Sequence, residues 1–250
     1  MYRTYGWKNS RPDHRDIKYR PRVAVENLPA SIDLRSKYPD PYDQLDLGSC
    51  TGNSIAGAVQ YKRREANKPD WTPSRLGIYF GERSIEGTTG QDAGAAIRDG
   101  MKVVNNQGTA SEEMWPYDTK QFTVKPPKSY YVEAAKNKVL VYEAVDNVQL
   151  DQCKSAIVDH GNLVLGFTVY ESFEGADVAK TGITPMPGKD ESALGGHAVC
   201  AVGYDDTKEW FIVRNSWGLG WGDGGYFYLG YSYVTNADLC DDCWSITSIR

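Results

Sequence analysis

The pattern of apolar residues changes at about residue 138, and this change restricts the possible folds more than any other feature of the sequence. Before it, apolar residues recur at helical spacing in three stretches, near 55–62, 76–80 and 93–105. After it, β-branched and aromatic residues predict five strands and one helix, at 139–145, 150–159 (the helix), 163–170, 197–204, 210–214 and 226–229. Helices followed by strands indicate an α+β protein with a helical half and a sheet half. The junction of two such halves is a natural cleft.

The composition is that of a globular protein of ordinary size. The chain has 250 residues, of which 40% are hydrophobic and 12% aromatic, enough to build a packed core. This length accommodates one large domain or two lobes. Since no run of about 18 apolar residues occurs, we expect no membrane-spanning segment and no membrane partner.

Charge is distributed unevenly along the chain. The net charge is −5, but residues 1–22, which include Arg3 and Lys8, hold seven basic and two acidic side chains. A basic arm therefore precedes an acidic body, and five prolines within 12–41 predict an extended arm. The acidic body disfavours a nucleic-acid partner. We hypothesise that residues 1–27 dock on the body and block its cleft, against the alternative of a solvated tail.

The cysteines do not form the pattern of a disulfide framework. Their number is odd, and they stand at Cys50, Cys153, Cys200, Cys240 and Cys243. The last two have the spacing of zinc and redox sites but lack a second ligand pair, so we predict no metal and no cofactor. The basic arm lacks the apolar core of a signal peptide. We therefore expect a reducing, cytoplasmic or otherwise intracellular location.

Three residues have local contexts that suit nucleophilic catalysis. Cys50 follows a Gly-Ser pair and starts the first helix, where backbone N–H groups and the helix dipole lower a thiol pKa. His197 follows two glycines and enters an apolar strand. Asn215 ends a strand, and Trp217 two positions later could shield an amide–imidazole hydrogen bond from water. Each residue, taken alone, also fits a structural role.

Taken together, these segments resemble the papain-like cysteine peptidases. The resemblance lies in Gln44 six positions before Cys50, in the His197-Ala198-Val199 run, and in the segment from Asn215-Ser216-Trp217-Gly218 through Trp221-Gly222 to Gly225-Tyr226. The order and spacing of the Cys, His and Asn agree with this group. The resemblance extends from the Leu28-Pro29 segment, which is similar to the start of the mature enzymes, to the end of the chain.

The resemblance implies a two-lobed fold and a set of site residues. Residues 1–28 would be the arm or a short pro-segment, 29–137 a mainly helical lobe with the nucleophile, and 138–250 a mainly β, barrel-like lobe, with the cleft between the lobes. Cys50 would be the nucleophile, His197 its general acid and base, and Asn215 the orienting group; Gln44 and the Cys50 N–H would form the oxyanion hole. Five residues would bind substrate: Gly94, Gly196, Ala198, Trp217 and Trp221.

Two departures at the nucleophile separate this chain from common family members. Leu47 replaces a disulfide-forming cysteine, and Thr51 replaces the aromatic residue that usually follows the nucleophile. Together with the short arm, these two departures make the chain similar to the disulfide-poor branch of the family, which is found outside animals and plants.

The predicted function is hydrolysis of peptide or protein substrates through a Cys50 thioester, in a zymogen that its own arm inhibits. We expect endopeptidase activity, although no residue of the sequence distinguishes an endopeptidase from an exopeptidase. An amidase or acyltransferase with the same Cys, His and Asn is the alternative. Asp241 or Asp242, at the floor of a substrate pocket, would favour a basic side chain.

Overall fold

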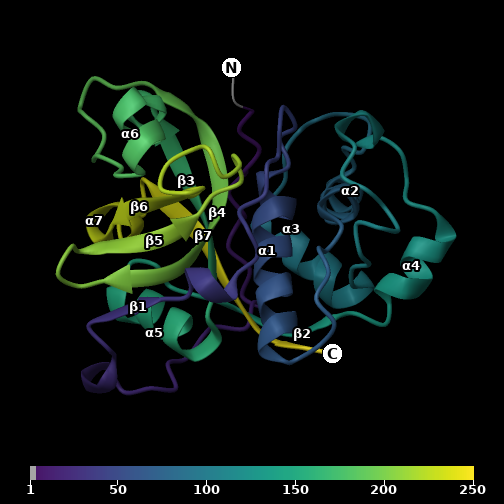
Figure 1. The fold of residues 1–250 in the computed structure, drawn as a ribbon, viewed down its shortest axis with the longest axis horizontal. Helices are drawn as coiled ribbons and strands as arrows, with labels where there is room; N and C mark the ends of the chain where they lie inside the picture. The colour runs from purple at the N-terminus through teal and green to yellow at the C-terminus, as the bar shows by residue number, and fades with distance from the viewer. Residues whose placement is uncertain (1–3) are drawn as a thin grey trace.

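Most of the strands gather on one side of the molecule, and the two longest helices lie on the other side (Figure 1). The computed structural model describes residues 4–250, so Arg3 and the two residues before it lie outside the described part of the predicted arm. One side holds α1 (Cys50–Glu65), α2 (Arg75–Glu86), α3 (Ile97–Lys102) and α4 (Lys128–Ala134). The other side holds α5 (Leu150–His160), α6 (Ala176–Thr181) and α7 (Tyr231–Val234). Within residues 4–250, no helix is both long enough and apolar enough to cross a bilayer.

The two longest helices of the helical half differ in how they are fixed: α1 by burial along its length, and α2 by local signals at its ends. Every residue of α1 from Cys50 to Arg63 is buried, so this helix runs through the interior. α2 is capped by Ser74, whose side chain accepts a hydrogen bond from the Gly77 N–H. It ends at Gly87, which adopts the left-handed conformation with φ 72°. The apolar spacing predicted both helices, and the structure confirms them.

The strands form one antiparallel sheet. They are β1 (Ser31–Asp33), β2 (Val139–Ala144), β3 (Leu163–Tyr170), β4 (Ala193–Asp205), β5 (Trp210–Arg214), β6 (Tyr226–Gly230) and β7 (Cys240–Ile249). Their order is β2-β7-β3-β4-β5-β6, with β1 also paired to β4. The sequence predicts β2 to β6 correctly but misses the short β1 and also β7, which lies between β2 and β3 in the sheet. Asp241 and Asp242 interrupt its apolar pattern, and Asp242 has a positive φ of 56°.

The sheet is open, so the barrel-like closure predicted for this half is wrong. Its end strands are covered by other segments instead of pairing with each other. Along β2, the Ala144 N–H donates to the Ile17 carbonyl of the arm, and the Tyr19 N–H donates back to Ala144. Along β6, Tyr228 exchanges backbone hydrogen bonds with Gly182 and Thr184. These contacts satisfy backbone groups that closure would otherwise pair.

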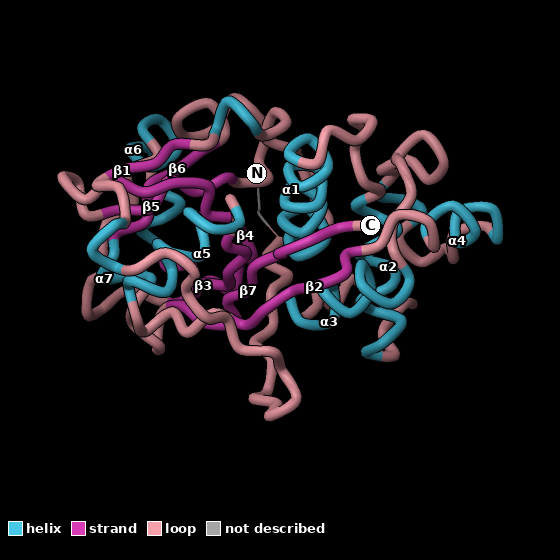
Figure 2. Tube along the Cα trace, turned by 90° about the horizontal axis from the view of Figure 1, so that it is seen from below, coloured by secondary structure: helices cyan, strands magenta, loops and turns pink. Residues whose placement is uncertain are grey.

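The long central helix joins the two halves. α1 packs against β4 and β7 of the sheet and against α2 and α3. Seen from below, β2 and β7 reach under α1 toward the helical side (Figure 2). A single large apolar cluster runs from α1 into the sheet and includes Ile55, Val59, Leu165 and Val199. The start of α1 therefore lies on the boundary between helices and sheet, held by core packing on both sides.

Candidate active site

A histidine, an asparagine and a tryptophan meet at this boundary. His197 lies in β4, and Asn215 directly follows β5. His197 Nε2 donates to Asn215 Oδ1 at 2.8 Å, and the Ser216 N–H donates to the same oxygen at 2.9 Å. Trp217 stacks on the imidazole with ring centroids 5.0 Å apart and 25° between the planes. The buried hydrogen bond and its aromatic cover hold the imidazole in one orientation.

The Cys50 thiol faces the strand that carries His197. Backbone groups of Ala198, the next residue of that strand, and of Gly6 in the arm lie beside the sulfur. Cys50 is fully buried, and burial raises the pKa of its thiol to about 11 although these backbone groups act in the opposite direction. The lowered thiol pKa predicted from the helix start is therefore wrong for this state, because the sulfur is shielded from water.

Gln44 lies beside the same site with its amide group fixed from both ends. Its Oε1 accepts a hydrogen bond from Ser216 Oγ at 2.7 Å. Its Nε2 donates to the Leu47 carbonyl at 3.0 Å and to the Thr4 carbonyl of the arm at 3.2 Å. An N–H group of Gln44 thus donates to a carbonyl oxygen of the arm, which is the type of donor that an oxyanion requires.

The arm passes directly over Cys50. The Ala95 N–H donates to the Gly6 carbonyl at 2.7 Å, and the Lys8 N–H donates to the Ala95 carbonyl at 3.0 Å. On the opposite side, the Trp7 N–H donates to the Gly196 carbonyl at 2.9 Å. Residues 6–8 are therefore held by backbone hydrogen bonds from the helical half and from the sheet.

The predicted substrate-binding residues occupy different positions around the arm. Gly196 and Ala198 border it, as described above. The Gly94 N–H donates to the Tyr79 hydroxyl, so Ala95 rather than Gly94 makes the backbone bonds to the arm. Gly94 still allows close approach, because a Cβ there would overlap the Gly6 carbonyl. Trp221 is buried and packs edge-on against Trp217 at 4.8 Å.

One carboxyl group near the site, that of Glu82, has no counterpart in the sequence predictions. Thr51, which directly follows Cys50, donates from Oγ1 to Glu82 Oε2 at 2.7 Å. Glu82 is fully buried, and within residues 4–250 its Oε1 has no hydrogen-bond partner. Burial raises its pKa to about 8. Asp242, which the sequence placed at the floor of a substrate pocket, accepts hydrogen bonds from Trp7 Nε1 and Ser10 Oγ of the arm. No sequence signal could have paired Thr51 with Glu82, because they come from different helices.

Comparison with known proteins decides the family. The profile described as "Papain family cysteine protease" matches residues 28–245. The chain belongs to the papain family of cysteine proteases. It is 37% identical to xylellain, a cysteine protease from Xylella fastidiosa, whose crystal structure it matches with a TM-score of 0.92 over 100% of this chain and 99% of that one.

Two curated proteins extend the comparison. An uncharacterised peptidase C1-like protein of Acanthamoeba polyphaga mimivirus is 38% identical over 99% of this chain and 88% of its own length. Cathepsin K of Gallus gallus is 29% identical over 88% of this chain and 64% of its own length. This chain is therefore a cysteine-type peptidase, a hydrolase, with the two-part fold predicted from its sequence.

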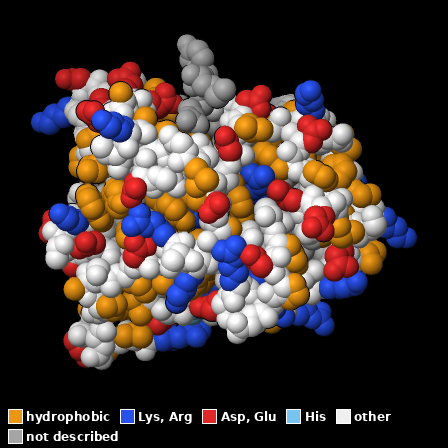
Figure 3. Space-filling view, in the orientation of Figure 1, with side chains coloured by type: hydrophobic (Ala, Val, Ile, Leu, Met, Phe, Trp, Pro, Cys, Tyr) orange, Lys and Arg blue, Asp and Glu red, His pale blue; other side chains and the backbone are white. Residues whose placement is uncertain are grey.

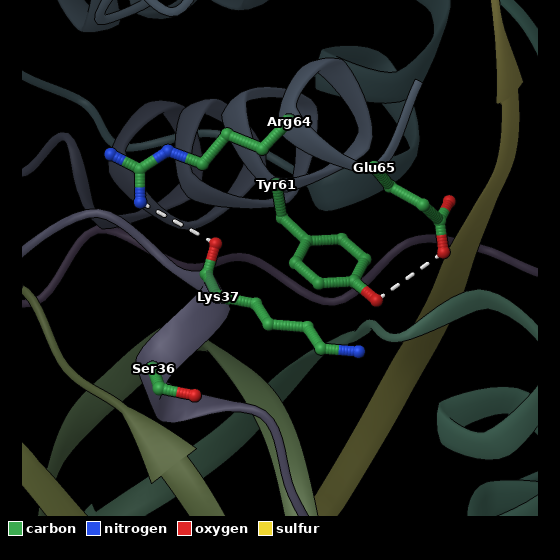
Figure 4. A pocket seen from close by; sticks show the side chains of 5 residues that line it. All are labelled: Ser36, Lys37, Tyr61, Arg64 and Glu65. Atoms are coloured by element: carbon green, nitrogen blue, oxygen red, sulfur yellow. Dashed lines mark hydrogen bonds between the residues drawn. The ribbon is translucent and has the colours of Figure 1, made fainter. Parts of the chain in front are cut away.

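A separate hollow of the protease lies near the far end of α1. It is lined by Ser36, Lys37, Tyr61, Arg64 and Glu65 (Figure 4). Tyr61 and Glu65 lie three to four turns of α1 from Cys50, so this hollow is not part of the cleft. Among residues 4–250, no three metal-ligating side chains cluster at this or any other place.

Proposed function

We propose that this protease cleaves peptide bonds through a thioester on Cys50, with His197 as general acid and base and Asn215 as the orienting group. The observation that carries the proposal is the buried hydrogen bond of 2.8 Å between His197 and Asn215. Because Nε2 of the imidazole faces Asn215, Nδ1 is the nitrogen that exchanges a proton with the thiol. The substrates are peptides or proteins.

The chemical steps follow from these positions. His197 takes the Cys50 proton, and the thiolate attacks the scissile carbonyl. Gln44 Nε2 and the Cys50 N–H donate to the oxyanion. The amine then leaves with the proton from His197, and a water molecule, deprotonated by the same imidazole, releases the acid and restores the thiol. The five cysteines are free thiols, which supports a reducing, cytoplasmic compartment.

We further propose that the N-terminal arm inhibits the protease in the state described here. Gln44, the proposed oxyanion donor, donates instead to the Thr4 carbonyl. Gly6 lies over Cys50, whose thiol remains protonated at neutral pH because burial raises its pKa to about 11. A substrate would need the same donor and the same space. The arm and a substrate therefore exclude each other.

Charge accounts for only a small part of this contact. Lys8 pairs with Glu86 at 3.0 Å, while Arg98 of the body pairs with Asp16 of the arm at 2.8 Å. Arg15 pairs with Asp13 inside the arm itself. Acidic and basic side chains are intermixed on the face that Figure 3 shows. We therefore expect salt to weaken inhibition less than the basic composition of the arm predicts.

One experiment separates catalysis from inhibition. A Cβ on Gly6 would overlap the Gly48 carbonyl oxygen, so Gly6→Ala displaces the arm without changing the body. We expect this variant to raise kcat/KM on a fluorogenic peptide at least about tenfold, equal to a shift of about 1.4 kcal/mol. Gly90→Ala is the matched control, since a Cβ there meets no atom within 4 Å.

The two proposals fail in different ways. Cys50→Ala should be inactive with and without Gly6→Ala, and peptide cleavage by either form would refute the assigned nucleophile. If Gly6→Ala leaves activity at the level of the Gly90→Ala control, the arm does not inhibit, while the assignment of Cys50 still holds. Transfer of the acyl group to an added amine faster than to water would indicate an acyltransferase.

A further inference from the structure

The first four residues of β7 are two cysteines with two aspartates between them. In a regular strand, residues three positions apart lie about 10 Å from each other and point to opposite faces. β7 is not regular here, because its register against β3 shifts by one residue between Asp241 and Trp244. The φ of 56° at Asp242 bends the strand at the same place. This bulge brings the thiols of Cys240 and Cys243 together.

The two thiols are in contact in the protein interior. Contact with the Cys240 thiol, together with burial, holds the pKa of Cys243 well above its usual range. The backbone of each cysteine is fixed by a neighbouring residue. Asn147 Nδ2 donates to the Cys240 carbonyl at 2.9 Å, and the Val145 N–H donates to the Cys243 carbonyl at 2.8 Å. The thiols are therefore held as neighbours, which is what formation of a disulfide requires.

A small hollow between the arm and the body reaches one of these thiols. It has a volume of about 130 Å³, and its lining includes Ser10 and Lys18 of the arm and Cys243 of β7. A water molecule takes about 30 Å³ of liquid, so a molecule as small as hydrogen peroxide has room there. Cys243 is thus the thiol that a small oxidant reaches first.

The two residues between the cysteines hold the arm. Asp242 Oδ2 accepts hydrogen bonds from Trp7 Nε1 at 3.2 Å and from Ser10 Oγ at 3.1 Å. Asp241 Oδ2 accepts one from Asn9 Nδ2 at 2.8 Å. These arm residues directly follow Gly6, which lies over Cys50. A change of conformation within the Cys-x-x-Cys segment therefore reaches the part of the arm that covers the nucleophile.

We propose that Cys240 and Cys243 form a reversible disulfide under oxidising conditions, and that this disulfide loosens the hold of β7 on the arm. This rests on the proposed inhibition by the arm. Bond formation draws the two sulfurs from van der Waals contact to about 2.05 Å. Because both cysteine carbonyls are fixed, the adjustment falls on Asp241 and Asp242 between them, and their hydrogen bonds to the arm are lost. The dithiol form keeps the arm bound, and the disulfide form releases it.

The oxidant is a small peroxide, and the reaction balances with hydrogen peroxide. The Cys243 sulfur gives up its proton and attacks one peroxide oxygen; the O–O bond breaks, a sulfenic acid forms, and the departing hydroxide takes a proton to become water. The Cys240 sulfur then attacks the sulfenic sulfur, gives up its own proton and displaces a second water molecule. The two thiols lose two electrons, which reduce the peroxide to water. An added dithiol reverses the step by thiol–disulfide exchange.

Mass spectrometry and hydrogen exchange test the proposal on the full chain with Cys50→Ala, which removes the active-site thiol and self-digestion. After treatment with hydrogen peroxide at pH 8, we expect the peptide that contains both cysteines of β7 to be lighter by two hydrogen atoms. The amides of Trp7 and Lys8, which donate to Gly196 and Ala95, should then exchange about 10- to 100-fold faster. This factor is that of one lost hydrogen bond to a charged group. An added dithiol should restore slow exchange.

Two cysteine variants serve as controls. Cys243→Ala should abolish the response to peroxide, so any effect of peroxide on other residues would persist in it. Cys200→Ala removes another buried thiol of the sheet and should respond as the parent does. If Cys243→Ala does not fold, Cys240→Ala serves in its place.

The failures are distinguishable. Absence of the disulfide after peroxide treatment would overturn the proposal, and so would a disulfide that joins Cys243 to the nearby Cys153 instead. A Cys240–Cys243 disulfide without faster exchange of the arm would overturn it as well. Amides of Trp7 and Lys8 that exchange at the unprotected rate already in the reduced protein would refute the inhibition by the arm, and the redox control with it.

Discussion

The buried carboxyl of Glu82 should make the stability of this protease fall as the pH rises through neutrality. The group is fully buried in α2, and its one hydrogen bond comes from Thr51. The charges around it do not offset its burial: Arg83 lowers its pKa, while Glu86 and Asp99 raise it. A neutral carboxylic acid is therefore the form that the fold accommodates.

The magnitude follows from linkage between proton binding and folding. The pKa of Glu82 rises from 4.5 to about 8, so between these values the folded chain holds a proton that the unfolded chain has lost. Stability then decreases by up to about 1.4 kcal/mol per pH unit, or roughly 5 kcal/mol in all, and changes no further above about pH 8 from this cause. Glu82→Gln, which keeps the shape without titrating, should lose this slope.

The assay is urea unfolding between pH 5 and pH 9, with Cys50→Ala in every protein to prevent self-digestion. Glu82→Gln should differ little from the parent at pH 5 and should be several kcal/mol more stable than the parent at pH 9. The exposed Glu113→Gln is the control, and its curve should follow that of the parent. Parallel curves for Glu82→Gln and the parent over the whole range would show that Glu82 is ionised or hydrated, and would refute the reasoning.

Three further outcomes test the proposed site. Gln44→Ala should lower kcat roughly 10²–10³-fold with little change in KM, since it removes one oxyanion donor; an unchanged kcat in steady-state assays would contradict its role. Asn215→Ala should lower kcat about 10²–10⁴-fold, because His197 loses its orienting partner, and should not alter binding of a peptide inhibitor. The rate of Cys50 alkylation by iodoacetamide should rise with pH up to about 11 in the full chain. In Gly6→Ala the rise should occur at lower pH, and identical profiles would argue against shielding of the thiol by the arm.

Much of the site could be predicted because its signals are local in the sequence. The Gly-Ser pair before Cys50 marks the start of a helix, and the apolar run after His197 marks a strand. The Asn215-Ser216-Trp217 run places an amide and its aromatic cover two positions apart. Each of these patterns depends on neighbours along the chain, and a resemblance to one family joins them into a site.

Other features escaped prediction because they depend on contacts between distant segments. β7 was missed because Asp241 and Asp242 break its alternation, and only pairing with β2 and β3 makes this segment a strand. The open sheet was missed because the arm and the segment at 182–184 cover its edges, which no periodicity reveals.

The sequence by itself determined the family, the order of the two long helices α1 and α2 and of strands β2 to β6, and the residues of the proposed catalytic site. Only the tertiary structure decided the protonation of Cys50 and Glu82, the path of the arm, and the meeting of Trp7 with Asp242. The physical reason is that residue type and spacing set local conformation and intrinsic reactivity. Burial and hydrogen-bond partners, which set the pKa and the shape of a pocket, arise only when segments far apart in the chain pack together.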